Sequence, residues 1–178
     1  MKSLKIACLA LVAVFMFTNS TCKKKIRLEK SINSKSIDFI ALPQAAGTFT
    51  FSKTQDLDID ALLKDYDLSL TNVMSIQPES LVITIEDTTA TPVTYDIVDN
   101  VILNMGTNTI PMKKVAWKDP MPKGGLTSVS PDVDTNIDIL ELAKANTISY
   151  DFTGKLNTAL NHQVKMKATF TWKVVGEL

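Results

Sequence analysis

The chain has 178 residues, with 19 basic side chains, 19 acidic side chains and two cysteines. This length favours a single domain with a hydrophobic core of its own. Residues 36–178 carry eleven basic and eighteen acidic residues, and their net charge of −7 argues against a nucleic acid as partner.

The first 21 residues have the three parts of a secretory signal peptide. Lys2 and Lys5 give a positive start, residues 6–17 are uncharged and apolar, and small or polar residues lead to Cys22. The apolar run is shorter than the ~20 residues that cross a bilayer. Removal of residues 1–21 would leave Cys22 as the only cysteine, which excludes an internal disulfide and a cysteine-based metal site.

The residues before Cys22 resemble the lipobox of bacterial lipoprotein precursors, in the relaxed form of the Bacteroidetes type. That motif has an aliphatic residue three positions before the cysteine and small residues at the next two positions. Ser20 and Thr21 fit this pattern, and Asn19 departs from it. The resemblance implies that Cys22 becomes the lipidated first residue of a cell-envelope protein, anchored to the outer membrane on its periplasmic face or at the cell surface. Ordinary cleavage after Ser20 is the alternative.

Residues 22–35 are predicted to form a basic tether behind this anchor. Six basic residues against Glu29 give the segment a charge of +5, and anionic head groups would attract each charge by about 1 kcal/mol. A plain soluble linker is the alternative. Residues 36–178 then form one domain.

Alternation of apolar and polar residues predicts that this domain is built from strands. The alternation is unbroken over residues 163–174, with Phe170 and Trp172 on the apolar face and Lys167 on the other. Residues 147–156 alternate as well, and the two segments are expected to pair as an antiparallel hairpin. Six less regular strands are expected over residues 36–42, 47–52, 68–76, 80–86, 91–105 and 109–117.

Turn-forming residues set the expected ends of these strands. The strand over residues 68–76 is expected to end before Pro78, and the strand over 91–105 to bend near Asp99. Pro111 favours an edge position for the strand over 109–117.

Two short helices are expected between the strands. One covers residues 58–66, with Asp58 or Asp60 as its cap, and the other covers residues 136–145, with Asn136 as its cap. The two segments share an Ile-Asp-x-Leu pattern, for which duplication and coincidence remain equally open. The predicted fold class is all-β, an immunoglobulin-like antiparallel β-sandwich with two short helices.

Residues 118–131 contain three prolines and two glycines, which argue against regular structure. Long loops on β-sandwiches often carry binding, and the ring of Trp117 could stack on a sugar or a protein. Trp117, Met121 and Lys123 are therefore the candidate residues for contact with a partner. A loop that tolerates insertions, beside a Trp117 that covers the core, is the plainer interpretation.

Motifs for catalysis and metal binding are missing or incomplete. The sequence has one histidine, His162, and neither Gly-x-Ser-x-Gly nor His-Glu-x-x-His, so His162 is expected to be an exposed loop residue. Asp56, Asp58 and Asp60 have the spacing of a calcium loop, but the glycine and glutamate that an EF-hand requires are missing. Neither a metal nor another cofactor is expected.

These patterns predict a lipid-anchored, non-catalytic envelope protein that binds a protein or a glycan or supports an envelope assembly. A carboxylate-dependent hydrolase acting on envelope glycans and a carrier of an apolar ligand are the alternatives. A filled core with an exposed aromatic patch would favour the binding protein, and an unfilled apolar pocket would favour the carrier. Two carboxylates that converge in a cleft, one with a raised pKa, would favour the hydrolase.

Overall fold

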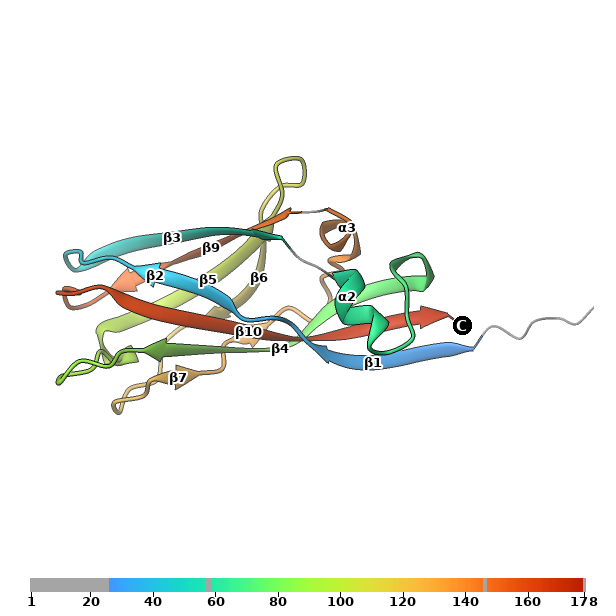
Figure 1. Cartoon of the computed structure of the whole chain (residues 1–178). Coiled ribbons are helices and arrows are strands. Elements are labelled where there is room, and N and C mark those ends of the chain that lie inside the picture. Colours follow the sequence, from blue (N-terminus) through green and yellow to red (C-terminus); the bar gives the residue numbers. More distant parts are fainter. Residues whose placement is uncertain (1–25, 57–58, 146, 178) are drawn as a thin grey trace, which may run out of the picture.

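The computed structural model describes residues 26–56, 59–145 and 147–177, so the signal segment and Cys22 lie outside the described residues. Two antiparallel sheets pack face to face (Figure 1). The first sheet contains β1 (Arg27–Asn33), β2 (Ile37–Ala41), β4 (Val73–Glu86), β7 (Ser128–Val129) and β10 (Val164–Glu177). The second sheet contains β3 (Gly47–Asp56), β5 (Val98–Gly106), β6 (Lys113–Lys118), β8 (Asp132–Val133) and β9 (Thr147–Leu156). The predicted all-β antiparallel sandwich is confirmed.

Short helical segments connect some of the strands. They are the α-helices α2 (Ile59–Lys64) and α3 (Leu140–Ala143) and the 3₁₀ turns η1 (Leu70–Asn72) and η2 (Tyr95–Ile97). Within the described ranges, every helix is too short or too polar to cross a membrane. The two α-helices lie in the segments where the sequence predicts them, and both are shorter than predicted.

The chain folds as one long antiparallel hairpin rolled up on itself. β1 and β2 pair with β10, β3 pairs with β9, β4 with β7 and β5 with β6, so each pair encloses the next one in sequence. Rolling places β10 beside β4 and β9 beside β5, which joins the pairs into two sheets. This nested order is that of a jelly roll, a double-sheet sandwich, so the strand order is not the immunoglobulin-like one that the sequence predicts.

The predicted hairpin between residues 147–156 and 163–174 is wrong. β9 lies between β3 and β5 in the second sheet, whereas β10 lies in the first sheet with β4 on one side and β1 and β2 on the other. Both alternation patterns are nevertheless correct, because the apolar face of each strand is buried. Period two reveals which face of a strand is buried, but it does not reveal which strand lies beside it.

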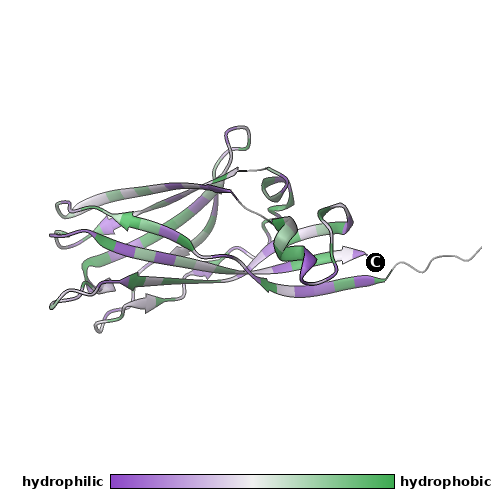
Figure 2. Ribbon diagram, in the orientation of Figure 1, coloured by the Kyte–Doolittle hydropathy of each residue, from purple (hydrophilic) through white to green (hydrophobic). Residues whose placement is uncertain are grey.

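Aromatic side chains fill the core between the sheets. Phe39 of β2 meets Phe152 of β9 edge to face, with 4.5 Å between the ring centroids, so this contact joins the two sheets. Phe170 stacks on Trp172 along β10 at 4.3 Å. Figure 2 shows the underlying alternation of hydrophobic and hydrophilic residues along the strands. Burial of one such side chain contributes about 1.5–3 kcal/mol.

β4 is one strand of 14 residues, not the two that the sequence predicts over residues 68–76 and 80–86. It runs through Pro78, which lies opposite Trp172 where the register with β10 shifts. A bulge tolerates the missing N–H of a proline, so Pro78 does not end the strand.

The sandwich begins earlier than the sequence analysis predicts. Arg27–Asn33 pairs along β10 as β1, so these residues belong to the first sheet and not to a tether. Of the predicted tether over residues 22–35, only the part before Arg27 precedes the first strand.

Three further boundaries differ from those predicted. β5 begins at Val98 because η2 occupies the residues before it, and a register shift between Val98 and Asn100 matches the bend expected near Asp99. β6 begins after Pro111 and pairs with both β5 and β8, so it is not an edge strand. Ser128–Val129, inside the stretch predicted to be irregular, pairs with β4 as β7.

The N-cap residue of α3 is Ile139, not the predicted Asn136, and the side chain that binds the start of the helix is that of the preceding Asp138. Its Oδ1 accepts hydrogen bonds from the N–H groups of Leu140, at 2.9 Å, and of Ile76 in β4, at 3.0 Å. One carboxylate therefore fixes the start of the helix and ties the helix to the first sheet.

Candidate functional site

An open cleft of about 710 Å³ lies where β2 and β3 form neighbouring edges of the two sheets. We call it the edge cleft. It extends over β2 onto the outer face of β10. Its lining residues are Asp38, Phe39, Ile40, Leu42, Pro43, Gln44, Thr50, Phe51, Ser52, Lys53, Glu86, Lys165, Met166 and Lys167. Its volume lies within the range of small-molecule sites, and its lining is more highly charged than is usual for them.

The strand period explains how charged and apolar groups come together in the edge cleft. In the register of the first sheet, Ile40 of β2 and Glu86 of β4 flank Lys165 of β10 on the outer face. The side chain of Ile40 is 54% exposed and that of Leu42 is 60% exposed. Apolar side chains at this exposure form a contact surface next to the lysines of β10.

Lys167 neutralises the acidic side of the edge cleft. Its Nζ donates a hydrogen bond of 2.6 Å to Oε1 of Glu86. The hydrogen bond and the charge of Glu86, together with the charge of Asp38, raise the pKa of the Lys167 ammonium. This lysine therefore stays protonated beside the carboxylate that it contacts.

Lys53 and Lys165 bring positive charge to the edge cleft without a matching carboxylate. Among the described residues, neither ammonium has an acidic partner within ion-pair distance. Lys53 continues the period-two face on which Phe49 and Phe51 lie, so it is a charged residue on the inward face of an edge strand. Lys167 neutralises Glu86, which leaves Asp38 as the other carboxylate of the lining. Lys53 and Lys165 therefore give the edge cleft a net positive charge.

Trp117, the first of the predicted partner-binding residues, lies on β6 away from the edge cleft. It is half-buried opposite Ile102 of β5, and the Nζ of Lys114 lies 4.6 Å from the centroid of its ring. The ammonium over this ring forms a cation–π contact that occupies one face of the indole.

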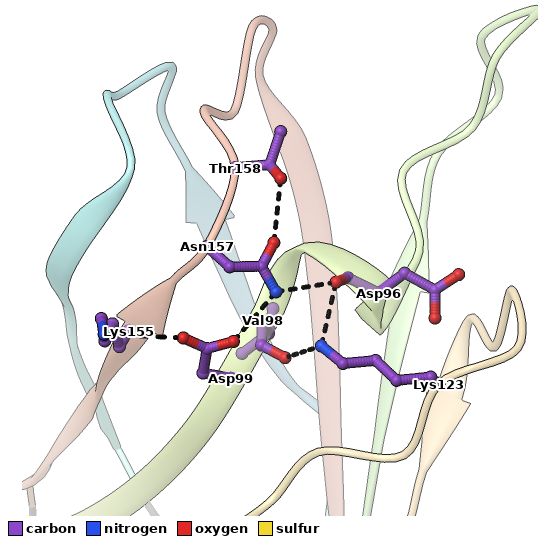
Figure 3. A network of polar contacts seen from close by, with 7 residues as sticks. All are labelled: Asp96, Val98, Asp99, Lys123, Lys155, Asn157 and Thr158. Carbon is purple, nitrogen blue, oxygen red and sulfur yellow. Dashed lines mark hydrogen bonds and ion pairs between the residues drawn. The ribbon is translucent and has the colours of Figure 1, made fainter.

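Met121 and Lys123, the other two predicted residues, hold the long loop against the segment around η2. Met121 is buried and its N–H donates to the carbonyl oxygen of Asp99 at 2.8 Å. The Nζ of Lys123 donates to the carbonyl oxygens of Asp96, at 3.0 Å, and Val98, at 2.9 Å (Figure 3). These contacts anchor the loop at Val98 and Asp99, where β5 begins. Trp117 lies farther along β5, opposite Ile102.

Asp96 is the centre of this loop network. Its carboxylate accepts hydrogen bonds from the N–H groups of Gly124, at 2.8 Å, and Gly125, at 2.9 Å. These two bonds are the main reason that the pKa of Asp96 lies below its usual value. Asn157 also donates to the carbonyl oxygen of Asp96, which links the loop between β9 and β10 to the same network (Figure 3).

His162 is half-buried and paired, not the exposed loop residue that the sequence predicts. Its Nε2 lies 2.8 Å from Oδ2 of Asp87. The side chain of Asp87 is 3% exposed, and it also accepts hydrogen bonds from the N–H groups of Val93, at 2.7 Å, and Thr89, at 3.0 Å. The pair closes the loop that follows β4.

Metal ligands do not cluster in the described part of the chain, where no group of three His, Cys, Asp or Glu side chains could hold a metal ion. Asp58 and the side chain of Asp60 lie outside the described set, so the calcium spacing noted above is not described as a whole.

The space between the sheets beside the edge cleft is small and apolar. It measures about 30 Å³ and is lined by core residues such as Phe49, Ile83 and Leu156. A cavity that binds a ligand as small as benzene measures about 150 Å³, so this space is too small for such an apolar ligand.

Comparisons with known proteins reveal only distant structural similarity. Neither a protein-family model nor a curated protein matches the sequence. Among solved structures, a chain of Desmodium yellow mottle tymovirus is 9% identical with a TM-score of 0.30, over 85% of this chain and 90% of that chain. A chain of turnip yellow mosaic virus is 15% identical with a TM-score of 0.28, over 85% and 96%. Similarity at this level supports no conclusion about function, and the fold described above stands on strand order alone.

The sequence analysis did not identify the edge cleft, although one signal for it was present. Lys53 interrupts the apolar face of a strand that otherwise continues from Phe49 and Phe51. A charge on the inward face is a common device on an edge strand, so the interruption predicts an open edge at this position. The pairing partners of β3 and the approach of β2 could not be read from the pattern.

Proposed function

We propose that this chain is a lipid-anchored, non-catalytic protein of the cell envelope that binds a partner in the edge cleft. The anchor rests on the signal-like first 21 residues and on Cys22. The binding role rests on one observation: the edge cleft combines exposed apolar side chains with two lysines that have no acidic partner among the described residues.

The position of the edge cleft supports this role. The start of β1 lies beside the C-terminus, whereas the turn from β2 to β3 lies at the opposite end of the sandwich (Figure 1). Arg27 is five positions after Cys22, a distance of at most about 18 Å in an extended chain. A lipid on Cys22 would hold the β1 end near the membrane, and the edge cleft would then face away from it.

Lipidation is tested by replacing Cys22. We expect Cys22→Ala to abolish labelling with palmitate and to release the protein from the membrane fraction, because the thiol is the attachment point. Cys8→Ala, within the leader, is the matched control and should leave both unchanged. Palmitate labelling that persists in Cys22→Ala would refute the anchor.

Binding at the edge cleft is tested by photo-crosslinking in intact cells. A photoreactive amino acid at position 40, which lines the cleft, should give an adduct of defined mass. The same residue at position 112 should not, because Met112 is exposed but lies outside the cleft. Equal adducts from both positions, or none from position 40, would contradict the assignment.

The same cleft keeps the hydrolase as a second candidate, since it contains Asp38 and Glu86. A glycosidase needs one carboxyl group that is protonated at working pH. Glu86 is instead held in an ion pair with the ammonium of Lys167 at 2.6 Å, and this engagement favours the non-catalytic role. Hydrolysis of an envelope glycan that is lost in Glu86→Gln would reverse this preference.

A further inference from the structure

β3 offers a long and regular free edge. Its ten residues pair with β9 in one unbroken register, from Gly47 opposite Leu156 to Asp56 opposite Thr147. On its other side, no backbone group of the described residues pairs with it. Because an antiparallel strand directs the N–H and C=O of every second residue to the same side, a row of unpaired groups lies along this edge.

The other sheet edges in the described part of the chain are blunted. β7 and β8, at the far edges of the two sheets, have two residues each. The edge beside β10 is divided into β1 and β2 by the break over residues 34–36. β3 has neither a proline nor a bulge, and Lys53 is its only lysine. A free edge of this kind is a template for an added strand.

The edge cleft lies along this free edge. Thr50, Phe51, Ser52 and Lys53 of β3 line it on one side, and β2 with the turn after it lines the other. An extended segment placed there would meet the backbone of β3 and, across the cleft, the exposed side chain of Leu42. Backbone pairing supplies affinity in such complexes, and side-chain contacts supply specificity.

The charge of the edge cleft selects the occupant. Lys53 and Lys165 have no carboxylate partner in the described part of the chain, so a strand with acidic side chains would complement them. A second copy of this chain would bring the same two lysines, and like charges facing one another across paired strands are destabilising. The basic run Lys23–Lys25 has the wrong sign as well.

We propose that β3 binds an extended acidic peptide as an eleventh strand, with Lys53 and Lys165 contacting its carboxylates. This rests on the proposed binding function of the edge cleft and names the class of partner. The inference joins three observations: the free ten-residue edge, the cleft beside it and the two uncompensated ammonium groups.

The test uses the mature chain and two synthetic octapeptides, one of alternating valine and glutamate and one of alternating valine and lysine. We expect the acidic peptide to bind at least about tenfold more tightly than the basic one. Binding should slow amide exchange at least about tenfold for those N–H groups of residues 50–53 that face the free edge, because they become hydrogen-bonded.

Charge-reversal variants locate the contact. Lys53→Glu combined with Lys165→Glu should weaken binding of the acidic peptide roughly tenfold or more, and Lys113→Glu should change it by less than about twofold. Lys113 is the matched control because it is an exposed strand lysine outside the edge cleft. A normal circular dichroism spectrum of each variant separates loss of binding from loss of fold.

Three results would overturn the proposal: no binding of the acidic peptide at about 1 mM, equal binding of both peptides, or binding without slower exchange in β3. A polyanionic sugar such as polygalacturonate, tested in parallel, should not slow exchange in β3. If the sugar binds through Lys53 and Lys165 while the acidic peptide fails, peptide pairing is refuted and a binding role for the edge cleft is retained. If adducts at position 40 are also absent, the binding role fails too.

Discussion

Oδ2 of Asp87 lies 2.8 Å from Nε2 of His162, and this contact joins the loop after β4 to the loop before β10. The same carboxylate accepts hydrogen bonds from the N–H groups of Val93 and Thr89, so three donors converge on one buried acid. A carboxylate with several donors is stabilised in its ionised form. The contact therefore links the end of β4 to the start of β10, and these two strands are neighbours in the first sheet.

Asp87 is predicted to make stability depend on pH in the acidic range. The hydrogen bond from Val93, followed by those from Thr89 and His162, holds the pKa of Asp87 well below the ordinary value of an aspartate. Its contribution should therefore be complete above about pH 4 and should be lost as the pH falls toward the folded-state pKa. Asp87→Asn should lower Tm by roughly 5 °C at pH 7 and by less at pH 3.

The exposed Asp65→Asn is the control for that series, since Asp65 is an exposed acid near the other end of the molecule. It should leave Tm unchanged at both pH values in thermal unfolding followed by circular dichroism. A deficit in Asp87→Asn that is equal or larger at pH 3 would show that Asp87 does not act through its charge.

Two buried tyrosines should respond in opposite ways to removal of the hydroxyl. Tyr95 Oη donates to the carbonyl oxygen of Ile83 at 3.2 Å, whereas Tyr150 Oη meets no hydrogen-bond partner among the described residues. Tyr95→Phe should lower the free energy of unfolding by about 1 kcal/mol, and Tyr150→Phe should leave it unchanged or raise it by up to about 1 kcal/mol. Urea unfolding with a common m-value measures both, and equal losses would contradict the assignment.

Asp96 is predicted to protect the long loop from proteolysis. Its carboxylate holds the N–H groups of Gly124 and Gly125, and the neighbouring Lys123 is bound to two carbonyl oxygens. Asp96→Ala should release this segment and speed tryptic cleavage after Lys123 by about tenfold under native conditions. Asp151→Asn, a change on the outer face of β9, should not. Mass spectrometry of the first fragments identifies the site, and an unchanged rate would mean that other contacts hold the loop.

The sequence predicted the parts of the fold that depend on local periodicity. The buried face of β10, from Val164 to Val174, agrees residue by residue with the alternation. The pairing of strands was not accessible in the same way, because β10 binds β4 and β1, which lie far from it in sequence. Pro78 shows a second limit: whether a proline ends a strand depends on a bulge opposite Trp172 that only the paired strand reveals.

The candidate site illustrates the same division. The residue types that line the edge cleft can be read from the sequence, including one lysine of β3 and two lysines of β10. These residues come together because β2 pairs with β10 in the first sheet, whereas β3 is the edge strand of the second sheet. Trp117 precedes the irregular loop and Met121 and Lys123 lie within it, which is why the sequence groups them. The structure instead separates Trp117 from the loop contacts that Met121 and Lys123 make.

The position of β10 determines when this protein can fold. β1, β2 and β4 all take their main-chain partners from β10, which consists of residues near the end of the chain. A nascent polypeptide that stops before Val164 therefore has no scaffold on which the first sheet can assemble. The first sheet should therefore stay unassembled until β10 itself has been synthesised, so folding of this domain is delayed until almost all of its strands are available.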